Sequence, residues 1–347
     1  MGCAITELLG DGIGPELSRA VHMLFDRLPV EAELIPVDLS LENRVRSGQD
    51  LYEKACESIR ATRFAIKYPT ITARESPNAI LRRLCGFSVI HRPVVSIPGL
   101  KTNFTQTIDV DVVRIATGGT YEDPGRMIGQ EAAVSIRIVE RKPCREAARF
   151  AFRLAEELKK TVTSSSKYTI QSVTDGLFQS VVDEIAKEYP LVPHRRELFD
   201  ALLAKLVLKP QDYSVIVVLN EYGDFLSDMV CGLVGSMGIG GSGNYSFNED
   251  GSVRLGLFDP AGGTAPDIAG KNIANPTGII FAVCLLFQQM GELELSQALR
   301  RAMLDLLSQG KATPDLGGSL STTEFTQCAI DECLRRLNGG HSKEKKS

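Results

Sequence analysis

Short apolar runs alternate with amphipathic segments in the first quarter of the chain, and this alternation restricts the possible fold more than any other feature. Three of the apolar runs are predicted to be strands, at residues 4–9, 32–37 and 64–68. Residues 51–62 have helical period, and Ser76 followed by Pro77 marks another helix start, because Ser suits the N-cap and Pro the first turn. Strands that alternate with helices predict an α/β fold with a parallel sheet.

The rest of the chain continues this pattern. Residues 132–139 alternate apolar and polar side chains, as a half-buried strand does. Buried strands are expected at residues 215–219 and 251–258. Helices are expected at residues 143–158, 173–189, 274–290, 292–309 and 322–337. A chain of 347 residues with these elements can form one large domain or two smaller ones.

Composition argues against two classes of function. The net charge of −4 gives no electrostatic support for binding nucleic acid. No apolar run reaches the roughly 18 residues that a membrane helix needs, so we expect no membrane partner. The eight cysteines form no Cys-x-x-Cys pair, and nothing at the N-terminus resembles a secretion signal. We therefore expect reduced thiols and an intracellular location, which is cytoplasmic, or the mitochondrial matrix if a presequence has been removed.

The strongest ligand signal is the stretch from Phe258 to Pro276, which reads Phe-Asp-Pro-Ala-Gly-Gly-Thr-Ala-Pro-Asp-Ile-Ala-Gly-Lys-Asn-Ile-Ala-Asn-Pro. Its glycines permit close backbone approach and its prolines stiffen the path, so the loop could hold a flat, polar ligand. It is not a phosphate-binding P-loop, because no Ser or Thr follows Lys271. Composition alone fits a structural loop about as well as a ligand loop.

This stretch resembles the cofactor loop of the β-decarboxylating dehydrogenases, the family of isocitrate and 3-isopropylmalate dehydrogenases. The family loop reads His-Gly-Ser/Thr-Ala-Pro, followed by Asp-Ile in NAD enzymes or Lys-Tyr in NADP enzymes. This chain has Asp267-Ile268, and a carboxylate can accept hydrogen bonds from a ribose diol but would repel a 2′-phosphate. The resemblance implies NAD as cofactor, with contacts from Thr72, Gly263, Thr264, Ala265, Asp267, Ile268 and Asn275.

The resemblance covers nearly the whole chain and implies an α/β fold with two domains and a parallel or mixed sheet. It is not a Rossmann fold, and the turn Gly10-x-Gly12-x-Gly14 also lacks the Rossmann spacing. By resemblance, residues 1–87 and 236–347 form a large cofactor domain and residues 88–235 a small domain. An arm near residues 121–151 would exchange between subunits. The resemblance thus implies a homodimer, or a hetero-oligomer with a related subunit.

The substrate positions come from a run of polar and basic residues. Ser76-Pro-Asn-Ala-Ile-Leu-Arg82 resembles the isocitrate enzymes, whereas 3-isopropylmalate enzymes carry apolar residues at the first positions. Guanidinium groups suit carboxylates because two parallel hydrogen bonds can form, although a single Arg is more often a solvated surface residue. The resemblance assigns substrate contacts to Lys67, Ser76, Asn78, Arg82, Arg92 and Arg114.

A pair of aspartates points to a metal. Asn220-Glu-Tyr-Gly-Asp-Phe-Leu-Ser-Asp228 resembles the family's Asn-Leu-Tyr-Gly-Asp-x-x-Ser-Asp. Asp224 and Asp228 are four apart, so they share a helix face, where a cation would relieve their repulsion. Taken alone, they could equally be helix-capping carboxylates. Hard oxygen ligands suit Mg²⁺ or Mn²⁺, and the resemblance adds Asp200 from a partner chain.

The acid–base residues follow from the resemblance alone. Tyr121 matches the family's proton donor, and Lys167 matches its lysine, which also serves the partner subunit's site. With these residues the resemblance implies oxidative decarboxylation of isocitrate to 2-oxoglutarate, with reduction of NAD. A proton acceptor, a proton donor and a divalent cation are what this chemistry needs.

Departures from the family pattern cluster near the cofactor and leave two alternatives open. Gly262 replaces the family's His, Ile115-Ala116 replaces Glu-Asn, Tyr68 replaces Gly, and Tyr168-Thr169 follows Lys167 in place of Gly/Ala-Asn. One alternative is a regulatory subunit of a hetero-oligomeric isocitrate dehydrogenase that does not turn substrate over. The other is a sister dehydrogenase for homoisocitrate, tartrate or 3-isopropylmalate. The retained tyrosine, lysine and aspartates favour catalysis, and Ser76 with Asn78 favours isocitrate.

Overall fold

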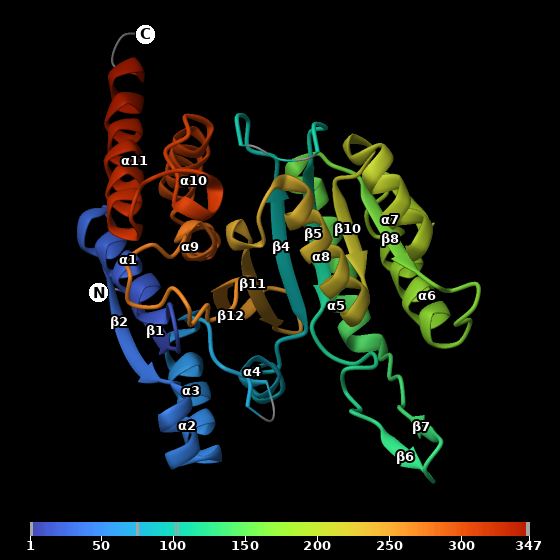
Figure 1. Cartoon of the computed structure of the whole chain (residues 1–347). Helices are drawn as coiled ribbons and strands as arrows, with labels where there is room; N and C mark the ends of the chain where they lie inside the picture. Colours follow the sequence, from blue (N-terminus) through green and yellow to red (C-terminus); the bar gives the residue numbers. More distant parts are fainter. Residues whose placement is uncertain (1–2, 74–75, 101, 103, 345–347) are drawn as a thin grey trace.

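The computed structural model describes residues 3–73, 76–100, 102 and 104–344 (Figure 1). Its main sheet has ten strands in the order β2-β1-β3-β12-β11-β4-β5-β10-β8-β9. These are β1 (Cys3–Leu9), β2 (Ala32–Asp38), β3 (Phe64–Lys67), β4 (Val89–Val95), β5 (Asp109–Ile115), β8 (Val162–Ser166), β9 (His194–Leu198), β10 (Val215–Val218), β11 (Gly241–Phe247) and β12 (Val253–Pro260).

The sheet consists of two parallel blocks with an antiparallel centre. Strands β2, β1, β3 and β12 are parallel, and so are β5, β10, β8 and β9. Strands β11 and β4 lie between the blocks and pair antiparallel with each other and with their outer neighbours. The predicted α/β fold with a mixed sheet is therefore confirmed. The division into residues 1–87 plus 236–347 and residues 88–235 stays a prediction, with β11 and β4 on either side of it.

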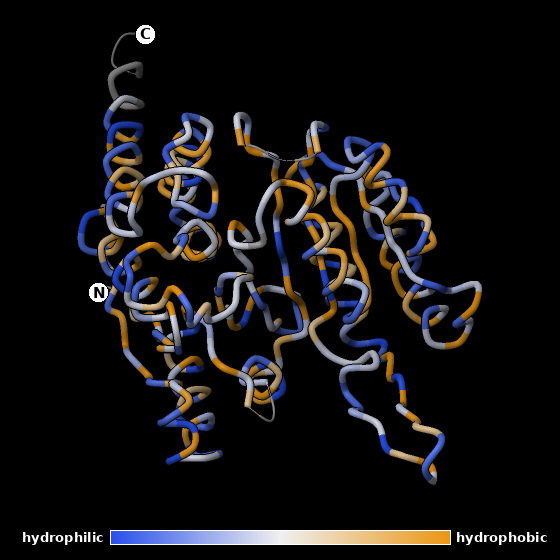
Figure 2. Tube along the Cα trace, viewed as in Figure 1, coloured by the Kyte–Doolittle hydropathy of each residue, from blue (hydrophilic) through white to orange (hydrophobic). Residues whose placement is uncertain are grey.

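Helices cover the sheet, and their sequences explain why. They are α1 (Gly14–Arg27), α2 (Leu41–Ser47), α3 (Gln49–Thr62), α4 (Pro77–Cys85), α5 (Arg141–Leu158), α6 (Thr174–Ala186), α7 (Phe199–Leu208), α8 (Asn220–Val234), α9 (Thr277–Met290), α10 (Leu293–Ser308) and α11 (Thr322–Glu344). Apolar and polar residues alternate along most of them at helical period (Figure 2). Helix α9 is the exception, because its residues from Thr277 to Phe287 are all buried against β11, β12 and α10.

Two further findings concern the helices and the cysteines. No helix of the described residues is long and apolar enough to span a bilayer. All eight cysteines are free thiols, as their spacing predicts.

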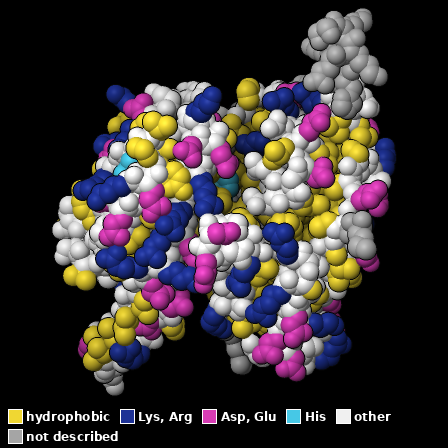
Figure 3. All heavy atoms as spheres, turned by 180° about the vertical axis from the view of Figure 1, so that it is seen from behind, with side chains coloured by type: hydrophobic (Ala, Val, Ile, Leu, Met, Phe, Trp, Pro, Cys, Tyr) yellow, Lys and Arg dark blue, Asp and Glu magenta, His cyan; other side chains and the backbone are white. Residues whose placement is uncertain are grey.

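The predicted half-buried strand at residues 132–139 is wrong. Only Ala132–Val134 is a strand, β7, which pairs with β6 (Arg126–Ile128) in a hairpin that extends away from the sheet (Figure 1). The side chains of Met127, Ile128 and Ile136 are 61%, 59% and 50% exposed, and the hairpin forms the lobe at the lower left of Figure 3. The alternation therefore reflects an apolar face that no described part of this chain covers.

Candidate active site

A cavity of about 970 Å³ is lined by residues of α4, β4, β5 and α8. It brings together eight residues that the sequence singles out: Ser76, Asn78, Arg82, Arg92, Arg114, Tyr121, Asp224 and Asp228. Ser76 occupies the N-cap of α4, as predicted, but its side chain makes no capping hydrogen bond with a described residue. Its hydroxyl is therefore not committed to the helix.

Strand register places the arginines. Arg114 on β5 pairs with Ile90 on β4, and Ile90 pairs with Asn244 on β11. The three residues form one row across the sheet, with Arg114 and Asn244 on either side of Ile90. Helix α8 crosses this face closely because of Gly223. A Cβ there would lie 2.5 Å from the Arg114 Cβ, so a larger residue would push α8 away from the arginine.

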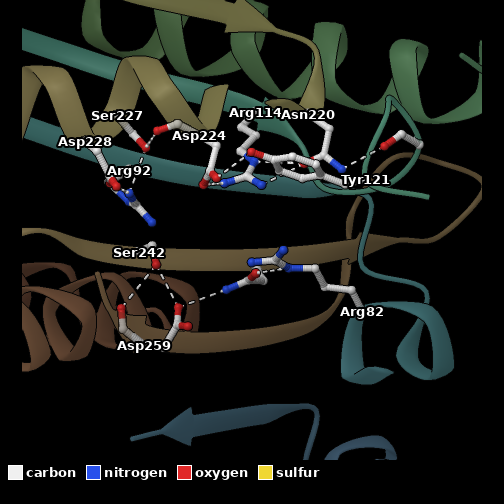
Figure 4. A network of polar contacts seen from close by, with 12 residues as sticks. Arg82, Arg92, Arg114, Tyr121, Asn220, Asp224, Ser227, Asp228, Ser242 and Asp259 are labelled. Atoms are coloured by element: carbon white, nitrogen blue, oxygen red, sulfur yellow. Dashed lines mark hydrogen bonds and ion pairs between the residues drawn. The ribbon is translucent and has the colours of Figure 1, made fainter. Parts of the chain in front are cut away.

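The two aspartates are paired with arginines. Arg114 donates through Nη1 to Asp224 Oδ1, and Arg92 donates through Nη1 to Asp228 Oδ1 at 2.9 Å. The Tyr121 hydroxyl donates to Asp224 Oδ2 at 3.0 Å (Figure 4). From the sequence we expected a cation to relieve the repulsion between the two carboxylates. In the structure, guanidinium groups already offset this repulsion.

Neighbouring side chains fix both arginines further. Asn220 Oδ1 accepts from Arg114 Nε at 3.0 Å and from Arg114 Nη2 at 2.8 Å. Ser227 accepts from Arg92 Nη1 at 2.7 Å. Burial lowers the pKa of the Arg114 guanidinium below its ordinary value. The substrate side of the cavity is thus held in place before any ligand contact.

A second network faces the first across the cavity. Arg82 Nε donates to Asn244 Oδ1 at 3.3 Å, and Asn244 donates to Asp259 Oδ1 at 3.1 Å. Ser242 donates to the same Asp259 oxygen at 2.7 Å (Figure 4). Burial, followed by the nearby charge of Arg114, lowers the pKa of Arg82 to about 10.

Lys67 lies in an adjoining cavity of about 200 Å³ that also reaches Thr72, Gly262 and Gly263. Its amine is buried and donates to the Tyr68 carbonyl at 2.9 Å and to Thr70 Oγ1 at 3.1 Å. Burial lowers the pKa of Lys67 to about 8, against the opposing effect of Asp259. The two cavities share Ser76, Asn78, Arg82, Arg92 and Ala261, so the predicted substrate and cofactor positions are neighbours.

Two buried polar atoms of the site are unpartnered within the described part of the chain. They are Asn78 Oδ1 and Arg92 Nε. Buried polar atoms are almost always hydrogen-bonded, so an acceptor and a donor left over in a cavity are positions where a polar ligand gains contacts. Asn78 and Arg92 both line the shared wall of the two cavities.

The aspartates fit a divalent cation in donor chemistry. The side chains of Asp224 and Asp228 are 38% and 54% exposed and line one cavity, and hard carboxylate oxygens suit Mg²⁺ or Mn²⁺. No group of three or more His, Cys, Asp or Glu side chains that could hold a metal occurs among residues 3–73, 76–100, 102 and 104–344. A cation held by Asp224 and Asp228 would therefore need further oxygen ligands from other groups.

Lys167 and Asp200 lie apart from this cavity. Lys167 follows β8, Asp200 lies in the first turn of α7, and Lys167 Nζ donates to Asp200 Oδ1 at 2.8 Å. Neither residue lines the cavity of Asp224 and Asp228. The structure brings these two predicted residues to each other, and their contribution to a second subunit remains a prediction.

The predicted cofactor loop follows β12 and is anchored at both ends. Ile13 donates its backbone N–H to the Thr264 carbonyl at 2.9 Å, and Gly12 has φ +59° with no room for a Cβ, which would lie 2.0 Å from that carbonyl. Asn275 donates to Asp315 at 2.8 Å and accepts the backbone N–H of Thr277 at 2.9 Å.

Several positions of the loop are exposed or have free space beside them. Asp267 is exposed, Ile268 packs against the core, and Ala265 has a positive φ of 37°. A Cβ built at Gly262 or Gly263 would meet no described atom within 4 Å. The donor set and the free space fit a nucleotide, because backbone and one carboxylate face solvent where a ribose could bind.

Sequence reasoning missed Ser242, Asn244 and Asp259 as site residues. Asp259 carried a signal, since it is the second residue of the stretch predicted to be the cofactor loop. Ser242 and Asn244 carried none, because their strand β11 shows no apolar run and their place depends on pairing with β4 and β12.

The mixed sheet, the arginine-rich cavity and the glycine-rich loop beside it define the class: an α/β protein of the dehydrogenase type with a site for a small anion. The chain belongs to the isocitrate/isopropylmalate dehydrogenase family, whose model matches residues 4–329. The confirmed resemblance places it among the oxidative decarboxylating dehydrogenases.

Relatives with different names are about equally similar. The chain is 34% identical to a mitochondrial isocitrate dehydrogenase [NAD] regulatory subunit of Dictyostelium discoideum, covering 96% of this chain and 93% of that one. It is 32% identical to the 3-isopropylmalate/3-methylmalate dehydrogenase of Methanocaldococcus jannaschii, over 92% and 95% of the two chains. The crystal structure of isocitrate dehydrogenase from Methylococcus capsulatus superposes with a TM-score of 0.87 at 30% identity, over 96% and 99% of the chains.

Proposed function

We propose that this chain catalyses the oxidative decarboxylation of isocitrate to 2-oxoglutarate with reduction of NAD. One observation carries the proposal: Arg82, Arg92 and Arg114 converge in a cavity that also holds Asp224, Asp228 and Tyr121. Three guanidinium groups match a substrate with three carboxylates, since each can bind a carboxylate through two hydrogen bonds. The Ser76 hydroxyl and the Asn78 amide N–H groups add donors to the cavity that a third carboxylate could use and that 3-isopropylmalate, with an apolar side chain, would leave without an acceptor.

The arginines would bind and orient the substrate. Arg92 and Arg114 are released from Asp228 and Asp224 when carboxylates of the substrate take their place. Among the described residues, Arg82 is held by Asn244 through Nε, which leaves its terminal nitrogens to point at a third carboxylate. Burial of these groups excludes water and strengthens each contact.

Tyr121 would supply the proton at carbon. Burial and the charge of Asp224 raise the pKa of Tyr121 above its ordinary value, so its hydroxyl stays protonated at neutral pH and is able to donate. The Arg114 guanidinium lies 5.9 Å from the centre of the Tyr121 ring and helps fix its orientation.

The cofactors would be held by residues already described. NAD would supply the hydride acceptor and Mg²⁺ or Mn²⁺ a positive charge beside the substrate's hydroxyl. Asp224 and Asp228 would hold the cation, with Asp200 of a second subunit. Thr72, Gly263, Thr264, Ala265, Asp267, Ile268 and Asn275 would contact NAD.

An oligomer is part of the proposal. Lys167 and Asp200 lie outside the cavity, so they would complete the site of a second subunit, and a monomer would be inactive. The exposed apolar side chains of the β6–β7 hairpin support an arm that packs on another chain. That chain is a copy of this one or a related subunit, because relatives are named as subunits. Free cysteines suit a reducing intracellular compartment, and the mitochondrial name of that relative makes the matrix a candidate.

A regulatory subunit is the second candidate, and the cofactor loop favours it. Gly262 lacks the side chain that the family places near the adenine, and a relative of equal similarity is named a regulatory subunit. Such a subunit would bind isocitrate at the same arginines without turning it over.

The test combines turnover and binding. The purified chain is assayed for NAD⁺ and NADP⁺ reduction with Mn²⁺ and isocitrate, with 3-isopropylmalate, homoisocitrate and tartrate as competing substrates. Isocitrate binding is measured in parallel by calorimetry. Turnover that prefers NAD⁺ and isocitrate supports the enzyme. Binding without turnover supports the regulatory subunit, whereas a better rate with another acid overturns the choice of substrate.

A further inference from the structure

Four side chains meet in the interior between the hairpin, α6 and α8, outside the cavities described above. Arg137 follows β7, Asp175 lies in the first turn of α6, and Glu221 and Tyr222 lie in the first turn of α8. We call these four residues the Arg137 cluster. None of them lines the cavity that holds Asp224.

One guanidinium holds two buried carboxylates in this cluster. Arg137 Nη1 lies 3.0 Å from Asp175 Oδ1, and Arg137 Nε lies 3.0 Å from Glu221 Oε1. Asp175 is fully buried and Glu221 is 5% exposed. Buried charges persist in proteins only when they are paired. Removal of any one charged member would leave an unpaired buried charge, which destabilises the folded chain.

Tyr222 completes the cluster. Its hydroxyl accepts from Arg137 Nη1 at 3.2 Å and donates to Asp175 Oδ2 at 3.2 Å, while the guanidinium lies 4.9 Å from the centre of its ring. Burial alone would lower the pKa of Arg137, but the Tyr222 hydroxyl and the two carboxylates together raise it. The guanidinium is therefore a permanent charge.

The cluster holds the segment of Lys167. Asp175 Oδ2 accepts the backbone N–H of Lys167 at 2.7 Å. Phe199 stacks on Tyr222 with ring centres 4.4 Å apart, and the next residue, Asp200, accepts the Lys167 amine. The main chain and the side chain of Lys167 are thus both tied to groups that contact the cluster.

The cluster also holds the segment of Tyr121. Gly119 exchanges two backbone hydrogen bonds with Ile138, the neighbour of Arg137, at 2.6 and 3.2 Å. Gly119 has φ +73°, and a Cβ there would lie 2.0 Å from Glu221 Oε2. Glu221 therefore packs directly on the backbone two residues before Tyr121.

Glu221 separates this chain from the family pattern, which has Leu after the Asn of Asn-Leu-Tyr-Gly-Asp. A Leu would leave Arg137 with Asp175 as its carboxylate partner in the cluster, whereas Glu221 adds a second. One Glu221 oxygen, Oε2, has no hydrogen-bond partner in the described part of the chain.

We propose that the Arg137 cluster positions the two acid–base residues, Tyr121 for the site of its own chain and Lys167 for the site that it would complete in a second subunit. Asp175 is the central positioning residue, because it accepts the Lys167 amide directly. The inference rests on the proposed function, in which Lys167 and Tyr121 move protons. It goes beyond that function by assigning a role to four residues that contact neither substrate nor cofactor.

Steady-state kinetics with isocitrate, NAD⁺ and Mn²⁺ tests the role. Asp175→Ala should lower kcat about 10- to 100-fold, the size expected when a catalytic group is misplaced by about 1 Å. The KM for isocitrate should stay within about threefold, because the cavity arginines are untouched. Asp175→Asn keeps one acceptor oxygen and should recover part of kcat, and Glu221→Leu should lose less than Asp175→Ala.

The matched control is Asp183→Ala on the same helix, whose carboxylate pairs with Gln179 and Arg196 instead. It should leave kcat within about twofold. An equal loss in Asp183→Ala, or a loss that follows the melting temperature across all variants, overturns the positioning role.

Hydrogen exchange at the Lys167 amide separates this inference from the proposed function. The amide should exchange faster in Asp175→Ala than in the wild-type chain, and at the wild-type rate in Asp183→Ala. Unchanged exchange in Asp175→Ala and Asp175→Asn overturns the inference whatever the kinetics show. A wild-type chain without turnover overturns the proposed function, and the exchange result alone then decides whether Asp175 positions Lys167.

Discussion

Arg92 and Arg114 hold charged partners and side-chain hydrogen bonds on the substrate side of the site, whereas the loop that would receive the cofactor leaves its exposed positions open. On the first side, Asn220 holds the Arg114 guanidinium and Ser227 holds that of Arg92. On the second, hydrogen bonds to neighbouring segments hold the loop before Ala265 and after Lys271, and the positions between include the exposed Asp267.

The departures from the family pattern follow the same division. Seven of the nine substrate and metal positions that the sequence predicts line one cavity, and Tyr121 lines the same cavity. Gly262 lies in the open loop, where a missing side chain costs no packing. A region of densely paired charges tolerates few substitutions, because each would leave a buried charge without a partner. An exposed loop can change with little effect on folding.

The largest effect is expected from the paired side. Asp224→Asn should lower kcat/KM for isocitrate about 10³-fold, since it removes a carboxylate that would hold the cation and fix Tyr121 and Arg114. Initial rates of NAD⁺ reduction with Mn²⁺ measure this. Asp331→Asn, a surface change on α11 with a 61% exposed side chain, is the control. If Asp224→Asn lowered kcat/KM by less than about tenfold, that result would contradict the assignment of catalysis to this cavity.

The next effect concerns Lys67 and pH. Burial lowers its pKa to about 8 from an ordinary 10.5, so between these values the unfolded chain carries a proton that the folded chain has lost. The contribution of Lys67 to the free energy of unfolding therefore rises with pH across this window, by about 3 kcal/mol in total. Below pH 8 the buried, protonated amine is destabilising by a similar amount.

Urea unfolding at pH 7, 8, 9 and 10 measures this as the difference between the wild-type chain and Lys67→Met. That difference should move in favour of the wild type as the pH rises. For Lys142→Met, whose side chain is 83% exposed, it should change by less than about 0.5 kcal/mol. A flat difference for Lys67→Met would show that the amine is hydrated in solution.

The smallest effect is expected in the open loop, and two glycines sharpen the contrast. Gly262→His has free space and should lower the KM for NAD⁺ about three- to tenfold, because an imidazole can stack on the adenine. Gly12→Ala should raise that KM by a similar factor, because its Cβ would strike the Thr264 carbonyl and move the loop. Isocitrate KM should stay unchanged in both. Equal effects of the two changes on both substrates would remove the distinction between the regions.

Elements with a clear apolar pattern could be predicted from the sequence, and those buried by polar contacts could not. The run Val215–Val218 forms the predicted strand β10. Strand β8 is equally buried but reads Val-Thr-Ser-Ser-Ser, which has no strand-like apolar pattern. The hydroxyls of Ser164 and Thr163 have side-chain partners, Gln179 and His194 for Ser164 and Arg195 for Thr163, whereas those of Ser165 and Ser166 have none in the described part of the chain. Hydrophobic periodicity cannot predict a buried strand whose own side chains are polar.

The candidate site shows the same limit. The family resemblance predicted Arg82, Asp224 and Tyr121, because the family motifs are local in sequence. Which arginine faces which aspartate depends on how β4 and β5 pair and on how closely α8 approaches, and the motif contains neither. The Arg137 cluster joins residues from three distant segments, so only the folded chain shows it.

The ion pairs of Arg114 with Asp224 and of Arg92 with Asp228 make ligand entry an exchange of partners. An incoming polycarboxylate competes with the aspartates for the guanidinium groups, and an incoming cation competes with the guanidinium groups for the aspartates. Each ligand therefore releases the groups that the other requires, and by thermodynamic reciprocity each should raise the affinity of the other, by about 1–3 kcal/mol. Under this arrangement, the doubly bound form would rise more steeply when both ligand concentrations increase together than when either increases alone.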